Sequence, residues 1–155
     1  CLDLPELPLK GNYNPLSYKL YYRDTGLLIA SLDDEAQEDL RKNQNFNTYK
    51  GAIYENIIAD CFVKQGYELY YYKNEKSTIE MDFFVRDANS VVPVEVKAND
   101  NATVSLNRLI DDEKFKEIKY GIKFCNKNIG YNGKFYTFPY FCVFFLKRYI
   151  LECKI

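Results

Sequence analysis

Histidine is absent from the 155 residues, and its absence excludes several common catalytic designs. Without an imidazole there is no Ser-His-Asp or Cys-His nucleophile, no His-bound zinc hydrolase and no histidine phosphorelay. The chain also lacks a Gly-x-x-x-x-Gly-Lys loop and a Gly-x-Gly-x-x-Gly turn, so it carries no nucleotide-binding motif. What remains for hydrolysis is a metal ion held by carboxylates, with a lysine beside it.

Paired cysteines and long apolar runs are also missing. The five cysteines are odd in number, widely spaced and never in a Cys-x-x-Cys pair, which argues against a zinc site or a disulfide framework. The richest apolar run, residues 138–146, is too short to span a bilayer and contains Pro139. We therefore expect a cytoplasmic protein in a reducing compartment, with no membrane partner. Because the chain starts at Cys1 and not at Met, we also expect a fragment or a processed product.

A β-hairpin is predicted in the middle of the chain. Two segments rich in β-branched and aromatic side chains, residues 79–86 and 91–97, flank four turn-forming residues. With Arg86 opposite Val91, the two strands pair in a single register in which side chains alternate between two faces.

Four polar side chains share one face of this hairpin, with Asp82 opposite Glu95 and Glu80 opposite Lys97. Like charges facing each other destabilise a strand pair, whereas a divalent cation between Asp82 and Glu95 would turn their repulsion into attraction. The alternative is a solvated face on which Glu80 and Lys97 form a cross-strand ion pair. The opposite face is wholly apolar and consists of Met81, Phe83, Val85, Val92, Val94 and Val96.

A helix that carries a glutamate precedes the hairpin. Residues 48–65 have apolar side chains at helical spacing, and Asn47 or Thr48 is a candidate cap at the start and Gly66 at the end. Glu55 lies at the edge of the apolar stripe, within reach of a sheet packed against it. The alternative for Glu55 is a glutamate at the solvent edge of the helix.

The remaining patterns complete an α/β fold with a mixed central sheet flanked by helices. Residues 1–15 hold three prolines and are interpreted as a linker or the tail of a preceding domain, and residues 16–155 as the folded domain. The other elements are a short strand or turn and then a helix within 16–32, strands at 67–73, 118–124 and 134–138, a helix at 103–115, and a strand or helix at 141–151.

The order of these motifs resembles two related groups of proteins. A helical glutamate, then Asp82 on one strand and Glu95-Val96-Lys97 on the next, resembles the core of the PD-(D/E)XK nuclease superfamily. The whole chain is more specifically similar to the C-terminal domain of unknown function that follows the P-loop domain of prokaryotic AAA+-type ATPases. The segments that carry this similarity are residues 18–28, 50–56, 66–72, 80–83 and 93–97.

The resemblance implies a restriction-endonuclease-like fold and metal-dependent hydrolysis of phosphodiester bonds in DNA. Asp82, Glu95 and the carbonyl of Val96 would hold Mg²⁺ or Mn²⁺, with Glu55 as an additional ligand. Asp82, Glu95 and Lys97 would be the catalytic set, with Lys97 positioning or activating the attacking water. The partner would be the N-terminal P-loop ATPase domain of the same polypeptide. The alternative is a catalytically inactive module that binds DNA or protein and regulates that ATPase.

Charge is distributed unevenly along the chain. The net charge is −1, but residues 114–155 hold nine basic and two acidic side chains. Such asymmetry is typical of a surface that contacts phosphate, although a solvated lysine face and docking onto the acidic half are alternatives. The candidate nucleic-acid-binding residues are Lys116, Lys119, Lys123 and Lys127.

Overall fold

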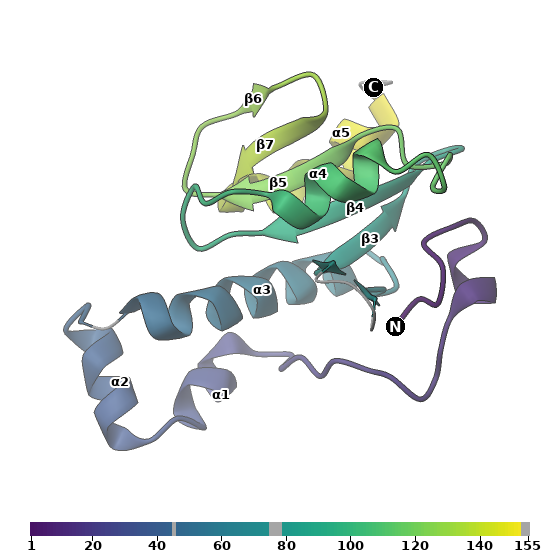
Figure 1. Cartoon of the computed structure of the whole chain (residues 1–155). Helices are drawn as coiled ribbons and strands as arrows, with labels where there is room; N and C mark the ends of the chain where they lie inside the picture. Colours follow the sequence, from purple (N-terminus) through teal and green to yellow (C-terminus); the bar gives the residue numbers. More distant parts are fainter. Residues whose placement is uncertain (45, 75–78, 153–155) are drawn as a thin grey trace.

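A five-stranded mixed sheet forms the centre of the protein (Figure 1). This computed structural model describes residues 1–44, 46–74 and 79–152, without the side chains of 46–48. The strand order is β3-β4-β5-β7-β6, with antiparallel outer pairs and parallel pairing of β4 with β5 and β5 with β7. The strands are β3 (Phe83–Arg86), β4 (Val91–Val96), β5 (Gly121–Cys125), β6 (Gly130–Tyr131) and β7 (Phe135–Pro139). The predicted α/β class with a mixed sheet is confirmed.

Helices cover both faces of this sheet, as Figure 1 shows. The long helix α3 (Phe46–Lys64) and the C-terminal helix α5 (Leu146–Glu152) pack on one face, and α4 (Val104–Asp111) packs on the other. The remaining elements are α1 (Thr25–Ala30), α2 (Asp34–Arg41), the 3₁₀ helices η1 (Leu9–Asn12) and η2 (Tyr140–Phe145), and a two-stranded sheet of β1 (Tyr72–Lys73) and β2 (Glu80–Met81). None of the helices in the described part of the chain is long and apolar enough to cross a membrane.

Alternation along the strands divides the apolar residues between two cores. Val92 and Val94 of β4 pack in the core under α3, which also contains Phe62. Val91, one residue earlier, points to the opposite face and packs with Leu106 of α4. Glu95 and Lys97 therefore belong to the α4 side of the sheet, and the helix with Glu55 belongs to the other side.

The hairpin register is as predicted, but the ladder is shorter. Arg86 pairs with Val91 and Phe83 with Val94, and the pairing ends there because the chain bends at Asp82. Beyond the bend, Glu80 pairs with Lys73 in the separate small sheet.

Two expectations that depended on a longer ladder are therefore wrong. Glu80 does not lie opposite Lys97, because its strand has left the hairpin. Met81 does not share the apolar face of Phe83, since the bend turns its side chain into the core on the α4 side, where it is fully buried.

The end of α3 is fixed by a glycine, as the sequence predicts. Gly66 has φ of 82°, and its N–H and that of Tyr67 donate to the carbonyls of Val63 and Phe62. The start differs from the expectation, because α3 begins at Phe46, ahead of the candidate caps Asn47 and Thr48. The side chains of those two residues lie outside the described part of the chain.

A second glycine lets α4 approach the sheet closely. A Cβ on Gly121 would lie 2.6 Å from Cδ1 of Leu106 and 3.2 Å from Cδ1 of Ile110. Gly121 is also the first residue of β5, so the observed strand starts three residues later than the predicted strand 118–124.

Several other segments refine the sequence expectations. Within 67–73 only Tyr72–Lys73 forms a strand. The undecided segment 141–151 is helical, because Val143, Leu146 and Ile150 recur at helical spacing and are all buried.

The first fifteen residues pack onto the domain. Leu2 is 1% exposed, and its N–H donates to the carbonyl of Tyr71 at 2.7 Å. Leu9 is buried in the same core. The segment interpreted as a linker or tail therefore contributes to the core of the domain, and the boundary at residue 15 stays a prediction.

Candidate functional site

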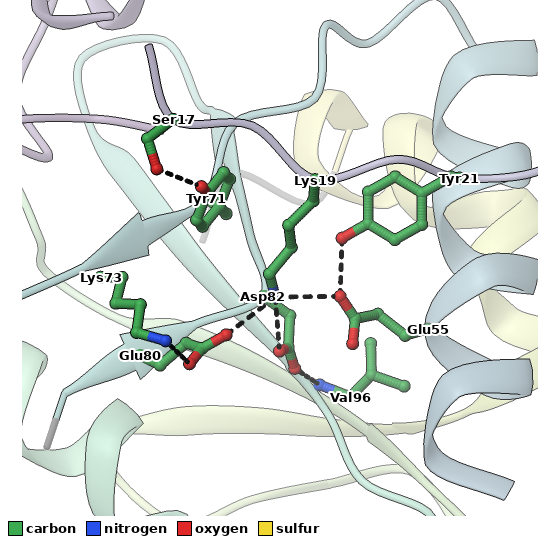
Figure 2. Close-up of polar contacts among 9 residues, drawn as sticks. All are labelled: Ser17, Lys19, Tyr21, Glu55, Tyr71, Lys73, Glu80, Asp82 and Val96. Carbon is green, nitrogen blue, oxygen red and sulfur yellow. Dashed lines mark hydrogen bonds and ion pairs between the residues drawn. The ribbon is translucent and has the colours of Figure 1, made fainter. Parts of the chain in front are cut away.

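A lysine lies at the centre of three carboxylates that come from three different elements (Figure 2). The ammonium of Lys19 is 3.1 Å from Glu55 Oε1 on α3, 3.1 Å from Glu80 Oε1 on β2 and 3.9 Å from Asp82 Oδ1 at the bend. Glu80 is also paired with Lys73, at 3.4 Å. The cluster thus joins segments that are distant in the sequence through one cation.

Lys19 belongs to an extended segment, residues 16–22, which we call the strap. Its side chains alternate, so that Ser17, Lys19 and Tyr21 point inward while Leu16 and Leu20 are 90% and 86% exposed. The inward hydroxyls form hydrogen bonds with the body of the domain. Ser17 Oγ lies 2.7 Å from the hydroxyl of Tyr71, and the hydroxyl of Tyr21 donates to Glu55 Oε1 at 2.6 Å.

Asn56 fixes the C-terminal end of the strap to α3. Its side chain is 3% exposed and binds both backbone groups of Tyr22, accepting from the N–H at 2.8 Å and donating to the carbonyl at 3.1 Å. It also donates to Thr25 Oγ1 at 3.0 Å. Because Asn56 follows Glu55 in the helix, the residue that holds the strap and the residue that receives Lys19 move as one unit.

Asp82 is tied to the neighbouring strand through a backbone group. Its Oδ2 accepts the N–H of Val96 at 2.8 Å (Figure 2), at the point where the β3–β4 ladder has ended. Val96 lies between Glu95 and Lys97, so this bond brings the acid of the bend to the acid-x-lysine segment of β4.

The environment of Asp82 opposes its ionisation. Burial and the negative charge of Glu55 raise the pKa of the Asp82 carboxyl to about 7, although the Val96 N–H and Lys19 act in the opposite direction. Burial alone would lower the pKa of Lys19, but the charges of Glu55 and Asp82 outweigh it and raise that pKa. The cluster therefore holds more carboxylates than ammonium groups, and Lys19 stays protonated.

Glu95 and Lys97 form a second polar group on the α4 side of the sheet. Lys97 Nζ is 2.7 Å from Glu95 Oε1, and the Glu95 side chain is 4% exposed. Burial raises the pKa of Glu95, and the hydrogen bond and charge of Lys97 partly oppose the rise. The other oxygen, Glu95 Oε2, is buried without a hydrogen-bond partner. An unpaired buried carboxylate oxygen is costly, and a cation or proton would satisfy it.

The predicted ligands are only partly brought together. Glu55 and Asp82 share Lys19, and Glu95 is turned toward Lys97. Within residues 1–44, 46–74 and 79–152, no group of three Asp, Glu or Cys side chains is arranged to hold a metal ion. The ammonium of Lys19 lies among Glu55, Glu80 and Asp82, whereas the metal ion was expected between Asp82 and Glu95 with Glu55 as an additional ligand.

The four candidate nucleic-acid-binding lysines do not form one patch. Lys116 and Lys119 are exposed before β5, and Lys127 is exposed after it, so the length of that strand, roughly 17 Å, separates them. Lys123 is buried within β5, and its ammonium donates to Asp100 Oδ1 at 2.7 Å. Lys123 therefore neutralises an acid of this chain, and it also lies beside Glu95 in the β4–β5 pairing.

Sequence reasoning missed Lys19, Tyr21 and Asn56. The available signal was the alternation of inward polar and outward apolar residues along 16–22, which is typical of an extended segment with one face against a surface. Asn56 gave no such signal, because a single asparagine on a helix is usually at the surface.

Comparison with known proteins places the chain in a family. The model of a family described as a domain of unknown function (DUF4143) matches residues 50–142, more than half of the chain. The match includes most of α3, with Glu55, the bend with Asp82 and the β4 segment with Glu95 and Lys97. No curated protein and no solved structure matches. The chain therefore belongs to the DUF4143 family.

Proposed function

We propose that this domain hydrolyses phosphodiester bonds in DNA with the help of a divalent cation, as a PD-(D/E)XK-like module attached to a P-loop ATPase. The observation that carries the proposal is the hydrogen bond from the Val96 N–H to Asp82. It joins the acid of the bend to the strand that carries Glu95 and Lys97, while Glu55 approaches the same acid from α3.

The donor atoms suit Mg²⁺ or Mn²⁺ in their chemistry. Glu55, Asp82 and Glu95 offer carboxylate oxygens, and hard cations prefer oxygen ligands. The unpartnered Oε2 of buried Glu95 supports the same inference, since a cation would satisfy it. When bound, the metal would polarise the scissile phosphate and lower the pKa of a bound water.

The other groups of the site have roles that follow from their positions. Lys97 holds a positive charge beside Glu95 and is 31% exposed, so its ammonium can reach a phosphate or orient a water. Tyr140 fixes the backbone there by donating its hydroxyl hydrogen to the carbonyl of Lys97 at 2.5 Å. Asp82 is held by Val96, so its carboxylate keeps a fixed orientation relative to β4.

A second function is favoured by a specific observation. Lys19 already forms ion pairs with Glu55 and Asp82. A domain in which this ion pair is permanent would need no metal. It would act as a non-cutting module that binds DNA or protein and regulates the ATPase.

Mn²⁺ binding and DNA cleavage by one set of variants test the proposal. We expect the parent chain to bind Mn²⁺ in calorimetry and to cleave end-labelled DNA in a reaction that EDTA stops. Glu95→Gln should lose both activities, because it removes a negative charge that attracts the cation and Mg²⁺ sites in proteins depend on one or two carboxylates. Glu113→Gln, a change at an exposed site outside the cluster, is the matched control and should behave as the parent. A parent chain that binds no Mn²⁺ and cuts no DNA would leave the regulatory module as the function.

A further inference from the structure

We propose that Lys19 is a built-in competitor for the divalent cation, so that the strap closes the site and must move before a metal ion can enter. This inference rests on the proposed function and adds a form of regulation to it. Its basis is that one ammonium contacts Glu55, Glu80 and Asp82 at 3.1, 3.1 and 3.9 Å (Figure 2).

The two cations exclude each other for electrostatic reasons. The ammonium of Lys19 lies against the carboxylate oxygens of Glu55 and Asp82 that a metal ion would need as ligands. A divalent ion bound to the same oxygens would lie within a few ångströms of that ammonium, where like charges repel strongly in a partly buried site. Lys19 must therefore leave Glu55 and Asp82 when a metal ion binds them.

The strap is built so that its central part can move while its end stays attached. Residues 18–22 form no regular secondary structure, and Tyr18 and Leu20 point into solvent at 70% and 86% exposure. By contrast, Asn56 holds both backbone groups of Tyr22. Release of Lys19 thus requires the loss of a few side-chain contacts of Lys19 and Tyr21, while Asn56 keeps Tyr22 attached to α3.

A cavity lies beside the cluster. It has a volume of about 180 Å³, and Lys19, Tyr21 and Asp82 are among its lining residues. Water occupies about 30 Å³ per molecule in the liquid, so the cavity has room for several waters. Mg²⁺ usually retains some of its waters in protein sites, and this space accommodates them.

Calorimetry of the whole chain with MnCl₂ provides the first test. Lys19→Met replaces the ammonium with an apolar side chain of similar length, so the carboxylates stay free for the metal ion. If the strap is closed in about nine molecules of ten, this change should tighten Mn²⁺ binding about tenfold. Lys73→Met is the matched control, because Lys73 contacts only Glu80 of the three carboxylates and is 63% exposed. The control should change the affinity much less.

Limited trypsin digestion of the parent chain gives a readout that needs no variant. Trypsin cleaves after lysine, and Lys19 is protected while its ammonium is held in the cluster. Mn²⁺ should increase the rate of cleavage after Lys19, whereas cleavage after exposed Lys127 should not change. This measurement decides the matter if Lys19→Met does not fold.

The outcomes separate this inference from the function on which it rests. Equal or weaker Mn²⁺ binding by folded Lys19→Met, or unchanged cleavage after Lys19 in metal-saturated parent, would overturn the competitor role and leave the proposed metal-dependent function standing. Absence of Mn²⁺ binding in both proteins would overturn both. Tighter binding with faster cleavage after Lys19 supports both.

Discussion

Lys19 and Glu55 form an ion pair of 3.1 Å between the strap and the long helix α3. The same Oε1 atom of Glu55 accepts the hydroxyl of Tyr21 two residues further along the strap. Both side chains are only partly exposed, so solvent screens this pair less than a surface ion pair. The state of the carboxylate cluster is thereby linked to the position of one extended segment.

Removal of the strap anchor should destabilise the domain. Asn56→Ala deletes three hydrogen bonds to Tyr22 and Thr25 and leaves two backbone groups of Tyr22 without their partner. We expect the free energy of unfolding to fall by about 1–3 kcal/mol, as measured by urea denaturation. We also expect faster tryptic cleavage after Lys19, because the strap loses its fixed end.

Thr25→Val is the control for this prediction. It deletes only the hydrogen bond between Asn56 and the Thr25 hydroxyl and leaves both bonds to the Tyr22 backbone. Its effect on stability and on cleavage after Lys19 should be clearly smaller. Equal effects of the two variants would mean that the backbone bonds of Tyr22 do not anchor the strap.

Asp82 should make the stability of the domain depend on pH. Its pKa is about 7 in the folded chain against an ordinary 3.8, so the folded state binds a proton that the unfolded state has released between these values. The stabilising contribution of Asp82 is therefore complete below the lower value and is lost as pH rises through about 7. Asp82→Asn removes this dependence and keeps an oxygen that can accept the Val96 N–H.

The comparison of parent and Asp82→Asn at two pH values measures the effect. Without metal, the variant should gain about 2–3 kcal/mol in unfolding free energy relative to the parent between about pH 5 and about pH 8. Mn²⁺ should raise the melting temperature of the parent and not that of the variant. A difference between the two proteins that does not vary with pH, or equal metal stabilisation of both, would remove Asp82 from the charged cluster.

Lys97 should be needed for cleavage but not for metal binding. Lys97→Ala removes the ammonium beside Glu95, and we expect a loss of roughly 10²–10³ in the rate of Mn²⁺-dependent DNA cleavage. Mn²⁺ affinity in calorimetry should persist, because lysine is not a ligand. Lys114→Ala, at an exposed site, is the control. A Lys97 variant that cuts DNA at the parental rate would exclude a catalytic role for the ammonium.

Substitutions in the basic C-terminal part of the chain distinguish lysines that contact DNA from lysines that stabilise the fold. Charge reversal of exposed Lys116 and Lys119 to Glu should weaken DNA binding and reduce the slope of its salt dependence, with no change in melting temperature. Fluorescence anisotropy at several salt concentrations measures both quantities. An unchanged slope would assign these lysines to solvent.

Lys123, in contrast to Lys116 and Lys119, should affect the stability of the domain and not its binding to DNA. Lys123→Met removes the ammonium that donates to Asp100 and to the carbonyl of Asn101, so the variant should have a lower melting temperature than the parent. The salt slope of DNA binding should stay as in the parent. A stable variant with a reduced slope would instead make Lys123 a phosphate contact.

The sequence predicted those features that depend on local pattern. The turn formers between two β-branched segments determined the hairpin register, and Arg86 does pair with Val91. The apolar spacing of residues 48–65 and the position of Gly66 predicted α3 and its end. In each case the residues that determine the feature lie close together in the sequence.

The arrangement of the site depends on contacts that no local pattern contains. The bend at Asp82 separates Glu80 from Lys97, and it coincides with a hydrogen bond to Val96, 14 residues away. Lys19 reaches Glu55 across 36 residues of sequence. An ion pair between residues so far apart in the sequence produces no periodic pattern. The sequence therefore identified the acids but not Lys19, the cation that lies between Glu55 and Asp82.

The bond between Asp82 and Val96 has a consequence for sequence change over evolutionary time. Its donor is a backbone N–H, so any residue except proline at position 96 can supply it. Drift among valine, isoleucine and threonine there leaves the carboxylate where it is. By contrast, the donors on Lys19, Tyr21 and Asn56 are side chains, and each is lost by a single codon change. Relatives should therefore keep the acid in place even where the strap that covers it has diverged.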